Sequence, residues 1–331
     1  MTLAATTPNP LPDPDPQKPL VMAVITNVGS TQNQTNWIEP YVAGEPGLVQ
    51  ITTSGPADID VAVGKAAAVK ADVIIVNGGD GTADLVFSAL LNRKTFTTPP
   101  AVALLAAGKT NMTAAAWSFD GDKVAAIKRI LAARRKGSLL RHITHRPILT
   151  IETGNDRPAL RGAFLGAADV VNGILFCREH IYPMKLPNPV SHALALGILF
   201  WRGFFSGARA EPMEARWDDG ATGESGKFFF ISATTLDKLI IGLSPQPDEG
   251  AGALHYLSLR AGAGVLLKAM PKLVTKNLKS GSGRMVRRTQ RMTLTFDGAY
   301  TLDGELYKAS RSQPLTISAN ETLPFIQIAA I

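Results

Sequence analysis

A glycine-rich turn that contains one acid is the segment of this sequence with the clearest chemical meaning. Residues 73–76 form a β-branched apolar run, and residues 82–92 have the pattern of a helix with Thr82 as its expected N-cap. Between them, glycines free the backbone to approach a ligand closely, and the N–H groups of a helix start attract phosphate. Because a carboxylate inside such a turn repels bare phosphate, Asp80 favours a divalent cation, and therefore a magnesium nucleotide. The turn reads Asn77-Gly78-Gly79-Asp80-Gly81-Thr82.

Two better-known nucleotide signatures do not fit this sequence. Gly79 and Gly81 begin a Gly-x-Gly pattern, but Asp84 stands where the dinucleotide fingerprint needs its third glycine. Gly108-Lys109-Thr110 looks like the end of a P-loop, yet Ala103 occupies the position of that loop's first glycine. A tight strand-to-helix connection without any ligand remains the simpler interpretation of the turn taken alone.

Two Asp-Gly dipeptides lie near the end of the chain. Asp297-Gly298 and Asp303-Gly304 each separate short runs of alternating apolar and polar residues. Asp-Gly between such runs is a strong β-hairpin signal, so the pattern by itself predicts two turns and no chemistry.

The order of the expected elements defines the fold class. Strands at 20–26, 73–76 and 101–106 alternate with helices at 56–70, 82–92, from about 111, and at 122–136, which predicts a doubly wound parallel sheet. After about residue 143 the pattern becomes a series of short strands, which predicts a mostly antiparallel, sandwich-like domain. We therefore expect α/β plus all-β architecture, with a disordered Pro-rich arm (1–19), an α/β nucleotide domain (20–142) and a β-rich domain (143–331), whose C-terminal end could pack back on the first domain.

The distribution of charge indicates the kind of partner. The formal net charge is +7, and residues 250–296 contain nine lysines and arginines but no acid. Lys268, Lys272, Lys276 and Lys279 recur at helical spacing, which predicts a polyanionic partner, although a solvated helix face is the common alternative. The run contains too few aromatic residues for stacking on nucleic acid, which we therefore exclude as a partner.

An apolar segment at 189–207 favours a membrane surface over other polyanions. It contains Leu199, Phe200, Trp201, Phe204 and Phe205, but it is too short to span a bilayer and is interrupted by Arg202 and by the glycines at 197 and 203. A buried core helix and an interfacial lip are both open readings of this segment. The single cysteine, Cys177, excludes an internal disulfide and fits a reducing cytoplasm. We expect a cytoplasmic, peripherally membrane-associated protein. A homodimer is a possible assembly that the sequence does not decide.

Four motifs, taken together, resemble the diacylglycerol kinase catalytic family, particularly its soluble bacterial lipid kinases and the sphingosine and ceramide kinases. The resemblance extends from about Leu20 to the end of the chain. It implies an α/β nucleotide domain followed by a β-rich domain, with the active site in the cleft between them. It also implies transfer of the γ-phosphoryl of ATP to a lipid hydroxyl, with Mg²⁺, in phospholipid metabolism. The motifs are Asn77–Thr82, Gly108–Asn111, Pro247–Gly250 and Leu302–Glu305.

The resemblance also implies roles for individual residues. Asp303 would be the general base with Glu305 beside it, and Asp80 would reach Mg²⁺ through water. Asp248 and Glu249 match a position that resembles a structural metal site, for which an exposed loop is the alternative. The nucleotide would be held by Asn27, Gly78, Gly79, Asp80, Gly81, Thr82, Gly108, Lys109, Thr110 and Asn111.

Three departures from the family pattern concern the nucleotide loops. The second loop reads Gly108-Lys109-Thr110-Asn111 where the family usually has Gly-Thr-Gly-Asn, and residues 28–34 lack the usual proline and basic residue. Leu85 replaces an acid that is common one turn after the glycine motif. We hypothesise that Lys109 supplies the charge that is missing near Asn27; an exposed loop lysine is the alternative.

Two other functions remain open. A soluble NAD kinase shares the Gly-Gly-Asp-Gly-Thr turn, but it predicts neither a membrane-directed surface nor the late Asp-Gly-Glu hairpin. A catalytically impaired lipid-binding relative would keep the fold and the basic surface. Retention of Asp80, Asp303 and Glu305 argues against that loss of activity.

Overall fold

The computed structural model describes most of the chain. The described residues are 20–35, 37–154, 157–176, 179–180, 197, 212–218, 222–239, 244–247, 249–274 and 277–331. The expected Pro-rich arm, the apolar lip at 199–205, Cys177 and Asp248 lie outside these residues.

One sheet begins as the parallel sheet expected from the sequence. Its strand order is β2-β1-β3-β4-β19-β16-β8-β9, with β5 and β6 attached through β19, and the pairs β2-β1, β1-β3 and β3-β4 are parallel. Strand β2 has no counterpart in the sequence-based expectation. The strands are β1 (Met22–Asn27), β2 (Leu48–Thr53), β3 (Val73–Gly78), β4 (Ala101–Ala106), β5 (Ile143–Glu152), β6 (Leu160–Gly162), β8 (Met213–Trp217), β9 (Gly223–Gly226), β16 (Arg291–Thr295) and β19 (Leu315–Ile326).

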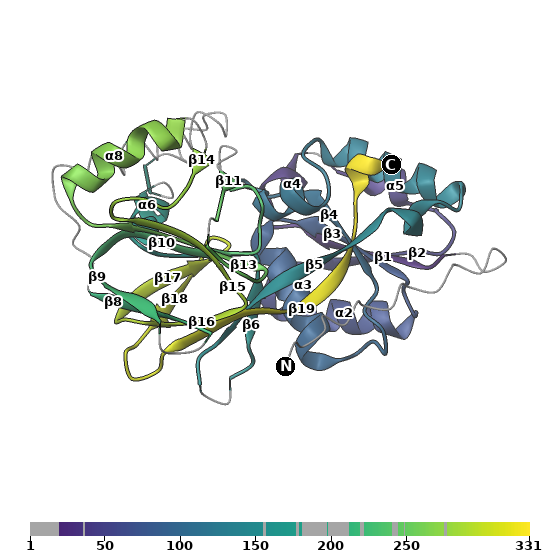
Figure 1. The fold of residues 1–331 in the computed structure, drawn as a ribbon. Coiled ribbons are helices and arrows are strands. Elements are labelled where there is room, and N and C mark those ends of the chain that lie inside the picture. Colours follow the sequence, from purple (N-terminus) through teal and green to yellow (C-terminus); the bar gives the residue numbers. More distant parts are fainter. Residues whose placement is uncertain are drawn as a thin grey trace.

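A second, largely antiparallel sheet lies in the other lobe of the molecule, together with β8, β9 and β16 of the first sheet (Figure 1). Its order is β12-β15-β13-β10-β7-β17-β18, and a short pair, β11-β14, stands apart. The predicted fold class, an α/β domain followed by a β-rich domain, is therefore confirmed. The strands are β7 (Phe164–Ala168), β10 (Phe228–Thr234), β11 (Ser244–Pro245), β12 (Glu249–Gly250), β13 (Leu254–Arg260), β14 (Asn277–Leu278), β15 (Arg284–Thr289), β17 (Gly298–Leu302) and β18 (Glu305–Ala309).

Helices cover the parallel part of the first sheet, and α6 and α8 belong to the second lobe (Figure 1). The helices are α1 (Glu39–Val42), α2 (Ile59–Ala68), α3 (Asp80–Arg93), α4 (Met112–Trp117), α5 (Lys123–Arg135), α6 (Asp169–Phe176) and α8 (Ala263–Val274), with 3₁₀ helices η1 (Thr31–Gln34), η2 (Pro56–Asp58), η3 (Leu139–His142) and η7 (Ile328–Ala330).

Strands β5 and β19 connect the two parts of the chain. They pair with each other from Ile143 to Glu152, and the far end of β19 pairs in parallel with β4, where Phe325 lies opposite Val102. In Figure 1 both strands run from one lobe to the other. The last strand of the chain thus becomes part of the α/β-domain sheet, beside β4.

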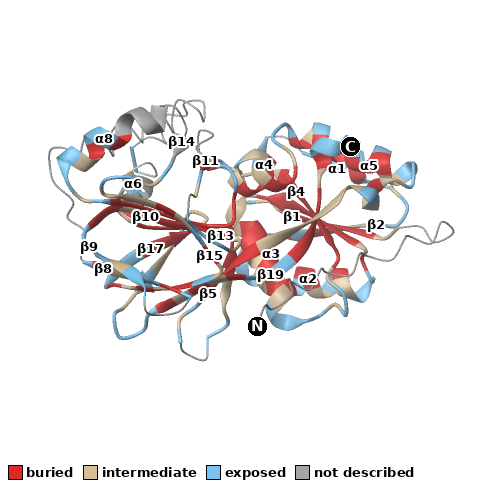
Figure 2. Cartoon of the chain, in the orientation of Figure 1, coloured by how far each residue is buried: buried red, intermediate tan, exposed pale blue. Residues whose placement is uncertain are grey.

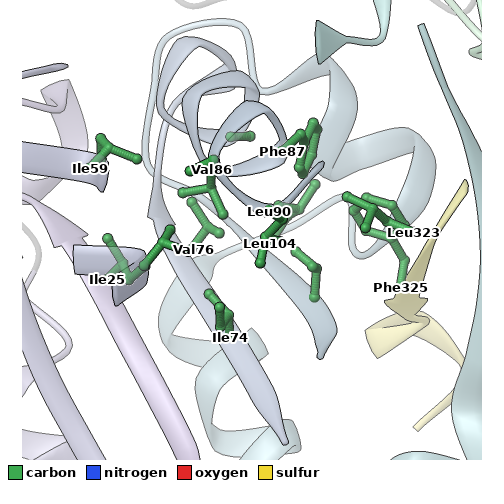
Figure 3. Packing of buried hydrophobic residues seen from close by; sticks show 14 of the residues in the cluster. Ile25, Ile59, Ile74, Val76, Val86, Phe87, Leu90, Leu104, Leu323 and Phe325 are labelled. Carbon is green, nitrogen blue, oxygen red and sulfur yellow. The ribbon is translucent and has the colours of Figure 1, made fainter. Parts of the chain in front are cut away.

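Buried residues follow the strands of both sheets (Figure 2). In the α/β domain, α2 and α3 pack their apolar sides on one face of the sheet, and α5 packs on the other. Figure 3 shows how Phe87 of α3 and Phe325 of β19 face each other in the first of these clusters. Their rings meet edge to face with centroids 5.5 Å apart, and Phe325 also lies 5.0 Å from the ring of Trp117.

We expect Phe325→Ala to lower the free energy of unfolding by about 3–5 kcal/mol, because it leaves a cavity among fully buried aromatic rings. Phe325 is 0 % exposed, so the neighbouring backbone has little freedom to close the gap. Denaturant titration would measure the loss. Trp37→Ala, at a side chain that is 49 % exposed, is the control and should change the free energy by less than about 1 kcal/mol. Equal effects of the two substitutions would contradict this account of how β19 is held.

Two local expectations were wrong. Helix α3 begins at Asp80 with Gly79 as N-cap, so Thr82 is not the cap. The turn is tighter than expected because the N–H groups of Thr82 and Ala83 both reach back to the Gly79 carbonyl. Helix α8 includes Pro271 and ends at Val274, so Lys279, which follows β14, cannot share a helical face with Lys268.

The basic block is partly neutralised by acids that the sequence places outside it. Arg260 lies 3.5 Å from Glu224, and Arg287 lies 3.6 Å from Glu249. The excess of unpaired positive charge in the basic block is therefore smaller than the sequence indicates. Among the described residues, no helix is long and apolar enough to cross a bilayer.

Candidate active site

The topology of the parallel sheet locates the candidate site. The chain leaves β1 toward β2 on one side and later adds β3 on the other side of β1, so the strand order reverses between β1 and β3. Ligands of open α/β sheets bind beyond the carboxyl ends of the strands at such a switch point. Here those ends are Asn27 of β1 and Gly78 of β3, with Ala106 of β4 beside them.

The two glycine turns touch through their backbones. A Cβ on Gly108 would lie 2.7 Å from the Gly79 Cα, and a Cβ on Gly79 would lie 3.1 Å from the Gly108 Cα. Real Cβ atoms do not approach main chain as closely as 2.7 Å, so position 108 requires glycine, whereas a Cβ at position 79 would make a tight contact that forces the neighbouring turn to shift. The contact brings the turns after β3 and β4 together as one surface.

Polar side chains fix the shape of these turns. Asn27 donates to the Thr82 hydroxyl at 2.9 Å and accepts from the Gly29 N–H at 2.9 Å. Asn111, whose φ is +52°, folds over its own turn and bonds both the N–H and the carbonyl of Gly108. The N–H groups of Asp80 and Gly81, in the first turn of α3, have no acceptor within the helix and are available to an anion.

Asp80 joins the two turns through its carboxylate. One oxygen accepts from the Met112 N–H at 3.1 Å and the other from the Thr113 N–H at 3.0 Å, at the start of α4. Burial raises the pKa of Asp80, whereas these hydrogen bonds act in the opposite direction. The carboxylate therefore has a structural task at the α4 N-terminus in addition to the role expected for it.

Asp303 enters the site from the other sheet, on the turn between β17 and β18. Its backbone is left-handed, with φ of +46°, and its N–H donates to the Phe164 carbonyl at 2.9 Å. One carboxylate oxygen accepts from the Ala163 N–H at 2.7 Å. A Cβ on Gly162, the last residue of β6, would lie 2.3 Å from that oxygen, so the glycine leaves room for the carboxylate. Unlike an ordinary hairpin turn, this one carries an inward-facing acid.

A second buried acid, Asp84, lies against Asp303. Burial raises the pKa of Asp84 well above its usual range, and the charge and hydrogen bonding of Asp303 add to this effect. Burial, followed by the charge of Asp80, raises the pKa of Asp303 to about 7. An Oδ1 atom of each carboxyl is buried without a hydrogen-bond partner. Two carboxyls in this arrangement share a proton or a cation.

In the sequence, Asp84 is notable only because it replaces the third glycine of the dinucleotide fingerprint, so a role for it in the site is not predicted. A usable signal was present, because Asp80 and Asp84 are four residues apart and so share one face of α3.

Glu305 and Tyr307 complete the group on β18. A Cβ on Gly81 would lie 3.5 Å from the Glu305 side chain, which places the exposed Glu305 beside the first turn of α3. Tyr307 stacks on Tyr300 with ring centroids 5.4 Å apart. Burial raises the pKa of Tyr307, and the charges of Asp84, Glu305 and Asp303 raise it further, so its ring belongs to the same cluster.

The remaining expected residues lie at different distances from this centre. Lys109 is exposed on the turn after β4 and Thr110 follows it there. Glu249 is on β12 at the edge of the second sheet, where it pairs with Arg287, and its expected partner Asp248 is outside the described residues. The described part of the chain contains no cluster of three or more His, Cys, Asp or Glu that could hold a metal.

Known proteins resemble this chain both in the sequence of one domain and in fold. Residues 22–141 match the sequence model of the diacylglycerol kinase catalytic domain. No match was found among curated proteins. A putative diacylglycerol kinase from Bacillus anthracis str. Sterne is similar in structure, with a TM-score of 0.63 and 16% identity over 94% of this chain and 98% of that one. Yeast NADH kinase, solved with NADH, has a TM-score of 0.50 and 10% identity over 94% of this chain and 84% of that one.

The chain therefore shares with these solved structures the fold of an α/β domain followed by a β-rich domain. Residues 22–141 thus match the diacylglycerol kinase catalytic domain, and the likeness of the chain as a whole to the solved structures is one of fold. The resemblance inferred from the four motifs is confirmed.

Proposed function

We propose that this protein is an ATP-dependent lipid kinase that transfers the γ-phosphoryl of ATP to a lipid hydroxyl at a membrane surface, facing the cytoplasm. One observation carries the proposal: the Asp303-Gly304-Glu305 turn of the second sheet lies against the start of α3, with Asp303 beside Asp84 and Glu305 beside Gly81. A proton acceptor is thereby brought to the turn whose backbone is suited to phosphate.

The nucleotide phosphates would lie on the turns after β1, β3 and β4. The N–H groups of Asp80 and Gly81 would point at them, and Lys109 would add positive charge from the exposed edge. A hard cation fits beside this acid cluster, where Asp80 would reach it through water, because Mg²⁺ usually takes one or two carboxylates and keeps waters and phosphate oxygens as its other ligands. Bound with ATP, Mg²⁺ would neutralise charge on the phosphates.

Asp303 would act as the general base. Its ionised carboxylate would accept the proton of the lipid hydroxyl as the hydroxyl oxygen bonds to the γ-phosphorus and the bond from phosphorus to the departing ADP oxygen breaks. The Ala163 and Phe164 N–H groups hold the carboxylate in place at 2.7 and 3.4 Å. Asp84, whose pKa burial raises well above its usual range, would in its protonated form donate a hydrogen bond to the ionised form of Asp303.

The surface of the second lobe supports a lipid acceptor. On α8 the side chain of Leu267 is 64 % exposed and is followed by the exposed Lys268, and on α6 Leu175 is 44 % exposed. Figure 1 places both helices on the same side of that lobe. Apolar side chains beside lysines are typical of surfaces that rest on anionic membranes.

The NAD kinase-like alternative has its own support in the structural likeness to yeast NADH kinase. A catalytically impaired lipid-binding protein is the third candidate. One experiment separates the three candidate functions. The protein is incubated with labelled ATP, Mg²⁺ and mixed micelles of diacylglycerol, monoacylglycerol, sphingosine, ceramide or phosphatidylglycerol, and a parallel reaction contains soluble NAD as the acceptor.

A labelled lipid that disappears with Asp303→Asn supports the proposal and identifies the acceptor. Label in NAD alone would replace the lipid kinase by the soluble alternative. ATP binding without transfer to any acceptor would favour the impaired relative.

We expect kcat/KM for the phosphoryl acceptor to rise with pH through an apparent pKa near 7, because the Asp84–Asp303 pair must lose a proton before Asp303 can accept one. Asp84→Leu should move this limb to higher pH, since Asp303 loses its hydrogen-bond donor. Asp84→Asn keeps a donor of the same shape and should leave the limb close to its original position. The pH profiles of the three proteins provide the measurement, and identical limbs in all three would show that Asp84 does not influence the base.

A further inference from the structure

A buried lysine lies beneath the nucleotide turns. Lys123 is the first residue of α5 and its side chain is 0 % exposed. Lys123 lies far along the chain from the loop after β1, and no sequence motif indicates a role for it.

The Lys123 ammonium bonds to the loop after β1. Its Nζ donates to the Gln32 carbonyl at 3.0 Å and to the side-chain oxygen of Asn33. Both acceptors are neutral, and within the described part of the chain Lys123 forms no ion pair with an acid. A buried cation at a helix N-terminus is unfavourable, because it loses hydration and faces the positive end of the helix dipole.

From these two acceptors, hydrogen bonds run to all three nucleotide turns. Asn33, which is 1 % exposed, donates to the Asn27 carbonyl at 2.8 Å and to the Asn77 carbonyl at 3.0 Å, at the ends of β1 and β3. The Gln32 N–H donates to the Ala107 carbonyl at 2.9 Å, and its side chain donates to the Gly108 carbonyl at 3.3 Å. Hydrogen bonds through Gln32 and Asn33 thus connect the carboxyl ends of β1, β3 and β4 with the Lys123 ammonium.

We propose that Lys123 is a positioning residue for the nucleotide. Its buried charge holds Gln32 and Asn33, so that the turns after β1, β3 and β4 keep a single arrangement, and the phosphates balance this charge when they bind. The inference rests on the proposed ATP binding. It also accounts for the uncharged segment 28–34: the family's usual basic residue is missing there, and Lys123 supplies positive charge from below the loop.

The electrostatic surroundings of Lys123 support this role. Burial lowers the pKa of Lys123 to about 8, and Asp122, on the same helix, acts weakly in the opposite direction. Asp122 is engaged as the N-cap of α5, where it accepts from the N–H groups of Val124 and Ala125. Residues 31–34 are uncharged; Lys109 and Asp80 are the charged residues of the neighbouring turns, and Asp80 faces Met112 and Thr113. Apart from Asp122, which is engaged as the N-cap, the described neighbours that hold the Lys123 ammonium are uncharged, and bound phosphates would add negative charge near it.

The experiment is calorimetric titration of the full chain with MgATP at pH 8.5, in two buffers that differ in ionisation enthalpy. Phosphate binding should raise the pKa of Lys123, so the wild-type protein should take up roughly half a proton on binding. Lys123→Met should lose this uptake and bind MgATP about tenfold more weakly, and the rise should appear in the KM for ATP more than in kcat. Lys128→Met, an exposed lysine on the same helix, is the matched control and should behave like wild type.

The outcomes separate this inference from the proposed function. If the wild-type protein does not bind MgATP at all, the proposed function fails before Lys123 is tested. If it binds MgATP without proton uptake, or if Lys123→Met keeps the wild-type affinity and uptake, the role of Lys123 is refuted. The wild-type measurement alone can refute the inference even where Lys123→Met does not fold.

Discussion

Asp303→Asn should lower the rate of phosphoryl transfer by about 10²–10⁴-fold while leaving MgATP affinity within about threefold of wild type, because a general base contributes to the transition state and little to nucleotide binding. Asparagine can still accept the hydrogen bond from the Ala163 N–H and can donate to Asp84. It also tolerates the left-handed backbone at this position, where φ is +46°. The fold of the turn should therefore survive the substitution.

The other Asp-Gly turn of the chain supplies a matched control. Asp297 is exposed, and its carboxylate accepts from the Arg311 N–H at 3.0 Å, away from the acid cluster. Asp297→Asn should change the rate by less than about twofold, because exposed ion pairs contribute little. Single-turnover transfer of labelled phosphate to the acceptor found in the micelle assay measures both variants. A loss of less than tenfold in Asp303→Asn would mean that another group accepts the proton.

Gly108→Ala should weaken MgATP binding by about 100-fold or more, because a displacement of about 1 Å in a positioning loop can have an effect of that size. The new Cβ would lie 2.7 Å from the Gly79 Cα and 3.1 Å from the Asn111 side-chain oxygen. Neither neighbour is the free end of a flexible side chain, so the two turns have to separate. Titration with MgATP gives the affinity directly, without an assumption about the acceptor.

Gly64→Ala controls for the loss of a glycine as such. A Cβ on Gly64, in α2, would meet nothing within 4 Å, and alanine is the better helix former by about 0.5–1 kcal/mol. That variant should bind MgATP like wild type and unfold at the same or a higher denaturant concentration. If Gly108→Ala also kept wild-type affinity, the close approach of the two turns would have no part in nucleotide binding.

Local sequence patterns predicted much of the α/β domain. The strand at 101–106 was placed at its observed bounds, and the helix expected at 122–136 is α5, because apolar periodicity and flanking polar residues are properties of short segments. The glycines of the first turn were recognised for the same reason. The pattern failed at the helix start, where the bond from Thr82 N–H to the Gly79 carbonyl tightened the turn, and at β2, which was not expected.

The sequence by itself determined the alternation of strands and helices in the α/β domain, the glycine turn at Asn77–Thr82 and, through the order of four motifs, the resemblance to the diacylglycerol kinase catalytic domain. Only the tertiary structure decided which distant groups meet. It placed Asp84 against Asp303, Lys123 beneath Gln32 and Asn33, and Phe325 beside β4. These contacts join residues far apart in the chain, and their energies come from burial and charge in an assembled interior. A pattern read along one segment carries no information about which other segment will supply its neighbour.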